Sequence, residues 1–276
     1  MNLRIGHSPD PDDAFLFYGL TQGKVPLEGI SIIHSLKGIE ELNQEALSGD
    51  LEMTAVSLHA YAHCADRYLL LRTGASVGEG YGPVVVSRSP LTLEDLKRME
   101  VAVPGPLTTA RLLLDLAVGP APRKYMPFDR ILDAVLEGQV PAGVLIHEGQ
   151  VTYGDHGLKK VVDLGQWWCD RTRLPVPLGV NVVRRDLGEP LLSRLAAALR
   201  ESLDYAFAHK EEALGYAGKF ARGLDPARVG RFVGMYVNRW SVDCKPDAAE
   251  AMQRLLDEGA GAGLLPGRVR IEFADP

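Results

Sequence analysis

Short apolar runs alternate with helix-like segments through the first half of the chain. Six runs end in polar residues and predict strands, and the segments between them have the apolar spacing of helices. The predicted strands are residues 3–7, 30–34, 53–56, 101–103, 124–126 and 142–146, and the predicted helices are 14–20, 39–47, 58–65, 109–117 and 130–136. Strands spaced by helices imply right-handed crossovers and mainly parallel sheets.

The pattern changes after residue 187, where the chain becomes nearly all helical up to about residue 258. Leu191, Leu195, Leu199 and Leu203 recur at helical spacing and mark one buried face. This tail is expected to pack against the sheet formed by the first strands.

Two apolar extended segments, residues 82–86 and 178–183, bracket the middle block of strands and helices. We interpret them as paired hinge strands that join two lobes. The predicted α/β fold therefore has a discontinuous first lobe, residues 1–85 and 180–276, and a second lobe, residues 86–179. A ligand cleft is expected between the lobes.

Polar residues follow the predicted strands at the point where each strand ends. Residues 8–13 follow the first strand, Ser57 the third, Thr108 and Thr109 the strand at 101, and His147 the strand at 142. Open parallel sheets bind ligands off the carboxyl ends of their strands. These residues are therefore expected to line one cleft.

His147 is the one histidine of seven that ends a fully apolar strand in this pattern. A neutral imidazole is a competent proton acceptor near pH 7, which makes His147 the candidate catalytic base. The alternative is a buried histidine that only hydrogen-bonds a carbonyl group.

Ser57 and Thr108 stand where helix N-caps belong, one in each predicted lobe. Two helix N-termini that face each other across a cleft would bind a small anion through free N–H groups. The alternative is that each residue is only a cap.

No metal site is expected. His59 and His63 lie four apart on a predicted helix beside Cys64, but no third ligand follows at a familiar interval. Asp10, Asp12 and Asp13 open a helix, where carboxylates usually act as caps and dipole partners.

Composition narrows the function classes. The net charge is −6 and no cluster of basic residues is present, which argues against a nucleic-acid-binding protein. No apolar stretch approaches the roughly 20 residues that cross a bilayer, and no export signal is recognisable at the start. Three scattered cysteines do not make a disulfide framework. We expect a cytoplasmic protein; the sequence does not indicate its oligomeric state.

Several segments, in order and with their spacing, resemble the menaquinone biosynthesis family of the futalosine pathway. The similarity extends over nearly the whole chain. It is carried by Ser8-Pro9-Asp10-Pro11-Asp12-Asp13-Ala14-Phe15, Gly82-Pro83-Val84-Val85-Val86, Val103-Pro104-Gly105, Thr108-Thr109-Ala110, Ile146-His147-Glu148-Gly149, Thr152-Tyr153 and Leu174-Pro175-Val176-Pro177-Leu178-Gly179.

The resemblance implies a type 2 periplasmic-binding-protein-like fold. It is strongest to the branch that converts cyclic dehypoxanthinylfutalosine to 1,4-dihydroxy-6-naphthoate, a lyase reaction without a cofactor. It further implies that His147 is the proton acceptor and that the substrate carboxylate is bound in the cleft. The substrate contacts implied by position are Ala55, Val56, Ser57, Thr109 and Ala110.

The sequence departs from the family at two places. Many members read Ser-Pro-Cys-Pro-Asn-Asp-Thr-Phe where this chain has Asp10, Asp12 and Ala14, and some have a lysine where Ala55 stands. Three alternatives therefore stay open: the chorismate dehydratase branch of the same family, a binding protein that captures a small carboxylate without chemistry, and a ligand-sensing module.

Overall fold

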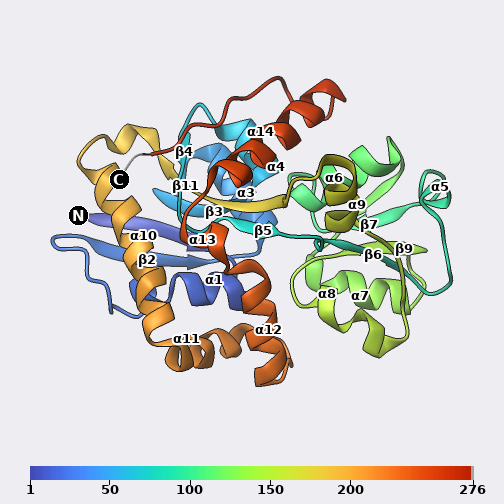
Figure 1. The fold of residues 1–276 in the computed structure, drawn as a ribbon, viewed down its shortest axis with the longest axis horizontal. Helices are drawn as coiled ribbons and strands as arrows, with labels where there is room; N and C mark the ends of the chain where they lie inside the picture. The colour runs from blue at the N-terminus through green and yellow to red at the C-terminus, as the bar shows by residue number, and fades with distance from the viewer. Residues whose placement is uncertain (275–276) are drawn as a thin grey trace.

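The computed structural model describes residues 1–274 and shows an α/β protein with two β-sheets. Each sheet belongs to its own lobe, and the two lobes lie side by side (Figure 1). The N-terminus and the last described residue, Ala274, whose N–H donates to the Leu70 carbonyl group, lie on the lobe that contains the first strands. We call this the first lobe and the other the second lobe.

The sheet of the first lobe is built from the beginning of the chain and one returning strand. β1 runs parallel to both β2 and β3, whereas the returning strand β11 runs antiparallel to β3, β4 and β5. In spatial order its strands are β2 (Ser31–Leu36), β1 (Asn2–His7), β3 (Met53–Ser57), β11 (Val176–Arg184) and β4 (Tyr68–Leu70), with β5 (Ser76–Gly78) also paired to β11.

The sheet of the second lobe is also mixed. β7 is parallel to β8 and β9, whereas β6 is antiparallel to β9 and β10. Its strands in spatial order are β10 (Lys159–Asp163), β6 (Val84–Ser87), β9 (Ala142–Leu145), β7 (Val101–Val103) and β8 (Arg123–Tyr125).

The α/β class and the individual strands predicted from the sequence are confirmed, but two details were wrong. The sheets are not mainly parallel, because β6, β10 and β11 run against their neighbours. The two segments interpreted as paired hinge strands do not pair with each other. β6 belongs to the second sheet, and the partner of β11 at the lobe junction is β5. The division at residues 85/86 and 179/180 stays a prediction.

The helices of the first lobe include most of the C-terminal part of the chain, as predicted. The helix expected over 14–20 is two short helices that meet at Phe17. The lobe contains α1 (Pro11–Leu16), α2 (Tyr18–Thr21), α3 (Ile39–Ser48), α4 (Leu58–Cys64), η2 (Arg185–Leu187), α10 (Leu191–Ala208), α11 (Lys210–Ala217), η3 (Gly218–Phe220), α12 (Pro226–Tyr236), α13 (Arg239–Val242) and α14 (Pro246–Gly261).

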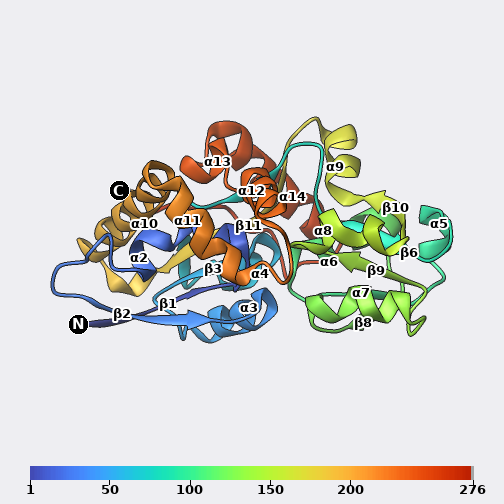
Figure 2. The same ribbon diagram turned by 90° about the horizontal axis from the view of Figure 1, so that it is seen from below.

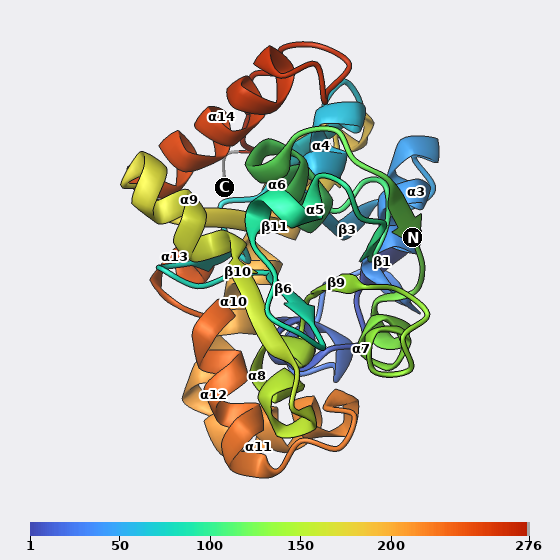
Figure 3. The same cartoon turned by 90° about the vertical axis from the view of Figure 1, so that its right-hand side faces the viewer.

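The helices of the second lobe surround its sheet, and α8 lies beside α12 of the first lobe in Figures 2 and 3. They are α5 (Leu93–Leu96), α6 (Thr109–Val118), α7 (Phe128–Leu136), α8 (Gly149–Thr152), η1 (Tyr153–His156) and α9 (Leu164–Thr172). Within residues 1–274, no helix combines the length and apolar character that crossing a membrane requires.

β1 shows why its residues form a strand that carries the site. Leu3 and Ile5 alternate with Arg4 and are fully buried against the helices of the C-terminal tail. Gly6 faces α3, where a Cβ atom would come within 2.9 Å of Leu42 in the helix and within 2.6 Å of Leu51 just after it. The helix can therefore pack directly on the strand, and the strand delivers its next residues to the lobe junction.

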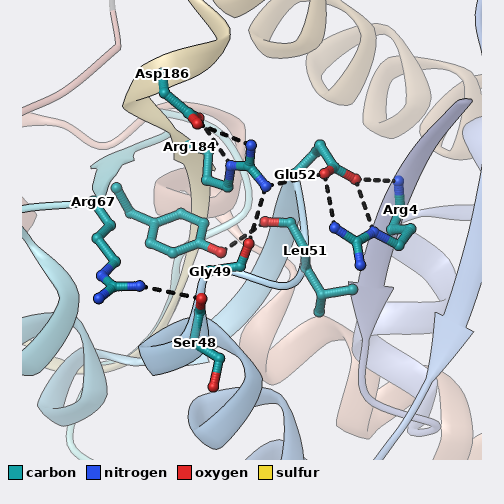
Figure 4. A network of polar contacts seen from close by, with 9 residues as sticks. Arg4, Ser48, Gly49, Leu51, Glu52, Arg67, Arg184 and Asp186 are labelled. Atoms are coloured by element: carbon teal, nitrogen blue, oxygen red, sulfur yellow. Dashed lines mark hydrogen bonds and ion pairs between the residues drawn. The ribbon is translucent and has the colours of Figure 1, made fainter. Parts of the chain in front are cut away.

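A charged network ties the sheet together at the opposite end of these strands (Figure 4). The Glu52 carboxylate accepts hydrogen bonds from the Arg4 backbone N–H at 2.7 Å and from the guanidinium groups of Arg4 and Arg184, each at 3.1 Å. Arg184 also bonds Asp186. The network links β1, the start of β3 and the end of β11, so it supports the scaffold and lies away from the site.

Candidate active site

A cavity of about 690 Å³, counting its open mouth, lies between the two lobes. Ligand sites for small organic molecules are typically of this size. All six residues that the sequence nominates line this cavity. They are Ala55, Val56 and Ser57 from the first lobe and Thr109, Ala110 and His147 from the second.

The loop between β1 and α1, together with the first turn of α1, delivers three carboxyl groups to the cavity. Asp10 caps α1 by accepting the Asp13 N–H, and Pro11 begins the helix with a residue that has no N–H to satisfy. Asp13 reaches back and accepts the Ser8 N–H at 2.9 Å. The Ser8 hydroxyl donates to Asp10. These bonds fix the loop, and Asp10, Asp12 and Asp13 all line the cavity.

His147 follows β9 in a left-handed backbone conformation, with φ of +52°. Such a conformation is costly for a residue with a side chain and is kept where the surroundings hold it. It turns the imidazole toward the other lobe, where Nδ1 lies 3.0 Å from Oδ2 of Asp10. The Phe128 ring packs edge-on against the imidazole, with the ring centroids 4.6 Å apart.

The Asp10 contact decides the proton arrangement of His147. A carboxylate at Nδ1 requires a proton there, which leaves Nε2 of the neutral imidazole with a free lone pair. Nε2 has no hydrogen-bond partner among the described residues. Burial disfavours the imidazolium ion, but the charge and hydrogen bond of Asp10 outweigh it and raise the pKa of His147 above its usual 6.5. The same pairing keeps the pKa of the buried Asp10 well below its usual range.

Asp12 and Asp13 are in the opposite situation. Burial and the neighbouring carboxylates raise the pKa of Asp12 well above its usual range. Burial, followed by the charge of Asp10, raises the pKa of Asp13 to about 8. Of the three carboxyl groups, Asp10, opposite His147, is therefore the one whose surroundings favour the charged form.

Asp10, Asp12 and His147 each offer one ligand atom, and these atoms lie within 4.8 Å of one another. Residues 1–274 hold no other group of three such side chains. Two of these atoms already form the Asp10–His147 hydrogen bond. The His59 and His63 rings are tilted by 55° with their centroids 5.4 Å apart, and Nδ1 of His59 is bonded to the Thr108 carbonyl group. His59 therefore has a structural partner.

The cavity lining also offers neutral hydrogen-bond donors. The Ser57 hydroxyl accepts a bond from the Asn43 amide at 3.1 Å and has its own proton free. The N–H groups of Thr109 and Ala110 stand in the first turn of α6, where no carbonyl group of the helix can accept them.

The Thr109 hydroxyl, in contrast, is already used. It donates to the Leu178 carbonyl at 2.6 Å and accepts the His59 N–H at 3.2 Å. The hydroxyl proton is therefore not free to bind a ligand, and both bonds join α6 to the first lobe. The backbone N–H of Thr109 remains available.

Sequence reasoning missed several cavity residues. Gln150, Asn181 and Tyr236 line it, and the Tyr236 hydroxyl hydrogen-bonds to the Gln150 side chain. Tyr236 is far from His147 in the chain, so no local pattern could place it there. The described lining contains no lysine or arginine.

Comparisons with known proteins identify the family of the chain. The family model for menaquinone biosynthesis matches residues 3–260. The chain is 46% identical to a 1,4-dihydroxy-6-naphthoate synthase from Thermus thermophilus over 267 residues, which is 95% of each chain. It is 37% identical to a protein of the same name from Streptomyces coelicolor over 270 residues, which cover 96% of this chain and 95% of that one.

Solved structures confirm the predicted periplasmic-binding-protein-like fold. A crystal structure of an Archaeoglobus fulgidus protein superposes with a TM-score of 0.91 at 47% identity, covering 96% of this chain and 98% of that chain. An alkanesulfonate-binding protein from Xanthomonas axonopodis, solved with bound MOPS, gives a TM-score of 0.71 at 18% identity and covers 98% and 96%. This second likeness concerns the fold alone. With the family model and both relatives in agreement, the chain belongs to the menaquinone biosynthesis family.

Proposed function

We propose that this protein converts cyclic dehypoxanthinylfutalosine to 1,4-dihydroxy-6-naphthoate, with His147 as the general base. The two curated relatives carry the name of this synthase and match nearly the full length of the chain. The observation that carries the assignment of the base is the Asp10–His147 pair, because it leaves Nε2 unpartnered at the cavity.

In the proposed step, Nε2 of His147 takes a proton from a carbon atom of the bicyclic substrate. The electron pair of that C–H bond forms part of the new aromatic ring, and the sugar-derived fragment leaves with the electrons of its own bond. Asp10 stabilises the imidazolium ion that forms, because its carboxylate already holds the Nδ1 proton at 3.0 Å. The gain of aromaticity drives the reaction. Because both bonds break heterolytically and the electron pairs balance, these steps need no electron transfer.

The substrate carboxylate would bind on the side of the cavity away from the three aspartates. No lysine or arginine lines the cavity within the described residues, so we assign the anion to neutral donors. The free Ser57 proton and the first-turn N–H groups of Thr109 and Ala110 supply such donors at the positive end of α6. Ala55 and Val56 would contribute apolar contact to the ring system.

A direct comparison of substrates tests this proposal against its rival within the family. Purified protein would be incubated separately with cyclic dehypoxanthinylfutalosine and with chorismate, and the products followed by liquid chromatography and mass spectrometry. We expect turnover of the first compound only. Turnover of chorismate would assign the chain to the dehydratase branch, and binding without turnover of either compound would favour a binding protein.

A further inference from the structure

One arginine of the first lobe reaches the surroundings of the catalytic pair without lining the cavity. Arg222 lies in the loop between η3 and α12 and has a φ of +40°, which is unusual for a residue with a side chain. Backbone strain of this kind is kept where the local contacts hold the residue in place. The side chain of Arg222 makes the contacts that hold this residue in place.

The guanidinium group of Arg222 joins three segments. Nη1 donates to the Glu148 carboxylate at 2.9 Å, and Nη2 donates to the Pro9 carbonyl at 3.1 Å. Its Cζ atom lies 4.6 Å from the centroid of the Phe128 ring, within the range of a cation–π contact. Lysine could not reproduce this set, because it lacks the planar fork of donors.

Each residue that Arg222 contacts is either a chain neighbour of Asp10 or His147 or packs against the His147 ring. Pro9 precedes Asp10 in the chain, Glu148 follows His147, and the Phe128 ring packs against the imidazole. Asp10 belongs to the first lobe and His147 to the second, so the 3.0 Å hydrogen bond between them depends on how the lobes meet. Arg222 holds both sides of that junction through one planar group.

We propose that Arg222 is a positioning residue that aligns Asp10 with His147 across the lobe junction. This inference rests on the proposed role of His147 as the base. Arg222 acts through Pro9, Glu148 and Phe128 and makes no contact with the reacting atoms. Its loss would let the two sides of the hydrogen bond separate.

Arg228 offers a matched control. It lies on α12, six residues further along the chain, and pairs with Asp155 of the second lobe. Its side chain is 41% exposed, compared with 32% for that of Arg222. Among the described residues, it makes no bond to Pro9, Glu148 or Phe128. If kcat depended only on ion pairs between the lobes, substitution of either arginine would lower it alike. If it depends on the alignment of Asp10 with His147, only substitution of Arg222 should lower it.

The test compares Arg222→Met, Arg222→Lys and Arg228→Met with the parent protein. Misplacement of a catalytic group by about 1 Å can cost on the order of 10²-fold in rate. We therefore expect Arg222→Met to lower kcat by about 10- to 100-fold, with KM changed less than about 3-fold. Arg222→Lys should recover part of kcat, and Arg228→Met should stay within about 2-fold of the parent.

A second readout does not depend on turnover. The charged or titratable groups around His147 are Asp10, Asp12 and Asp13 from the facing loop, Glu148 beside it and Arg222. Asp10 raises the pKa of His147. A larger distance between these two side chains in Arg222→Met should therefore shift the NMR titration of the His147 ring to lower pH. The same titration should be unchanged in Arg228→Met.

These readouts separate failure of this inference from failure of the proposed function. If the parent protein turns over neither compound but the titration still shifts in Arg222→Met alone, the positioning role stands and the assigned reaction does not. Equal losses of kcat in Arg222→Met and Arg228→Met would overturn the positioning role, as would an unshifted titration in a folded Arg222→Met protein. Circular dichroism and thermal melting would establish that each variant is folded.

Discussion

Replacing Asp10 by asparagine removes the negative charge that faces His147 while keeping the shape of the side chain. Asp10 accepts from Nδ1 at 3.0 Å in a buried setting, and its carboxylate opposes burial in setting the pKa of His147. A charge-assisted hydrogen bond of this kind contributes about 1.5–3 kcal/mol. If that stabilisation acts on the imidazolium formed in the transition state, its loss lowers kcat by about 10- to 160-fold, since about 1.36 kcal/mol is tenfold in rate.

The pH dependence follows from the same contact. The base must be neutral, so activity is lost as the pH falls through the pKa of His147. With Asp10 present, this loss occurs above pH 6.5, because the pKa is raised. Without the Asp10 charge, burial is the main remaining influence, and it lowers the pKa. The acidic limb of the rate profile should therefore move to lower pH in Asp10→Asn.

The assay measures kcat and kcat/KM between pH 5 and pH 9 for the parent, Asp10→Asn and Asp12→Asn. Asp12 is the comparison variant, because burial and the neighbouring carboxylates raise its pKa, so asparagine removes less negative charge there than at Asp10. Asp12→Asn should leave the acidic limb in place. The reasoning is refuted if Asp10→Asn keeps kcat within 2-fold of the parent and the limb does not move.

Three further outcomes are expected. Ser57→Ala removes the free hydroxyl proton and should weaken binding of 1,4-dihydroxy-6-naphthoate by about tenfold in calorimetric titration; unchanged affinity would place the carboxylate elsewhere. Asp13 has a folded-state pKa of about 8 against an unfolded value near 3.8, so it costs stability increasingly from about pH 4 to pH 8. Asp13→Asn should therefore raise the urea-unfolding free energy more at pH 8 than at pH 5, by up to about 4 kcal/mol, because each pH unit between the two pKa values contributes about 1.4 kcal/mol; an equal gain at both would contradict the raised pKa. Glu52→Gln removes the charge shared by Arg4 and Arg184 and should lower the melting temperature by about 2–4 °C without changing KM.

Much of the site could be predicted because it is local in sequence. His147 follows four fully buried strand residues, and Ser57 and Thr109 stand where strands give way to helices. The period of the apolar residues marks such positions, and a sheet brings its strand ends together. The six nominated residues therefore line one cavity.

The remaining features depend on contacts that no local pattern encodes. Strand direction is set by how distant segments pair, so the antiparallel placement of β11 against β3 could not be derived from its apolar run. The hydroxyl of Thr109 is used by Leu178, which is 69 residues away. Arg222 and Tyr236 reach the site from the helical tail, whose leucine spacing predicts packing alone.

Asp10 shows most clearly which part of the site could not be predicted from the sequence. From the sequence it was interpreted as a helix cap, and that interpretation is correct, since it accepts the Asp13 N–H. The same carboxylate also bonds His147, because the second lobe places an imidazole against its other oxygen. One residue thus serves the fold and the site, and only the three-dimensional arrangement shows the second role.

The most direct test of the account is single-turnover kinetics of His147→Asn and the parent protein with cyclic dehypoxanthinylfutalosine. The rate of 1,4-dihydroxy-6-naphthoate formation would be followed by quenched flow, and substrate affinity would be measured separately by calorimetry. The account predicts that the variant forms product at least about 10²-fold more slowly while binding the substrate within a few-fold of the parent. A variant that forms product within a few-fold of the parent rate would show that His147 is not the base.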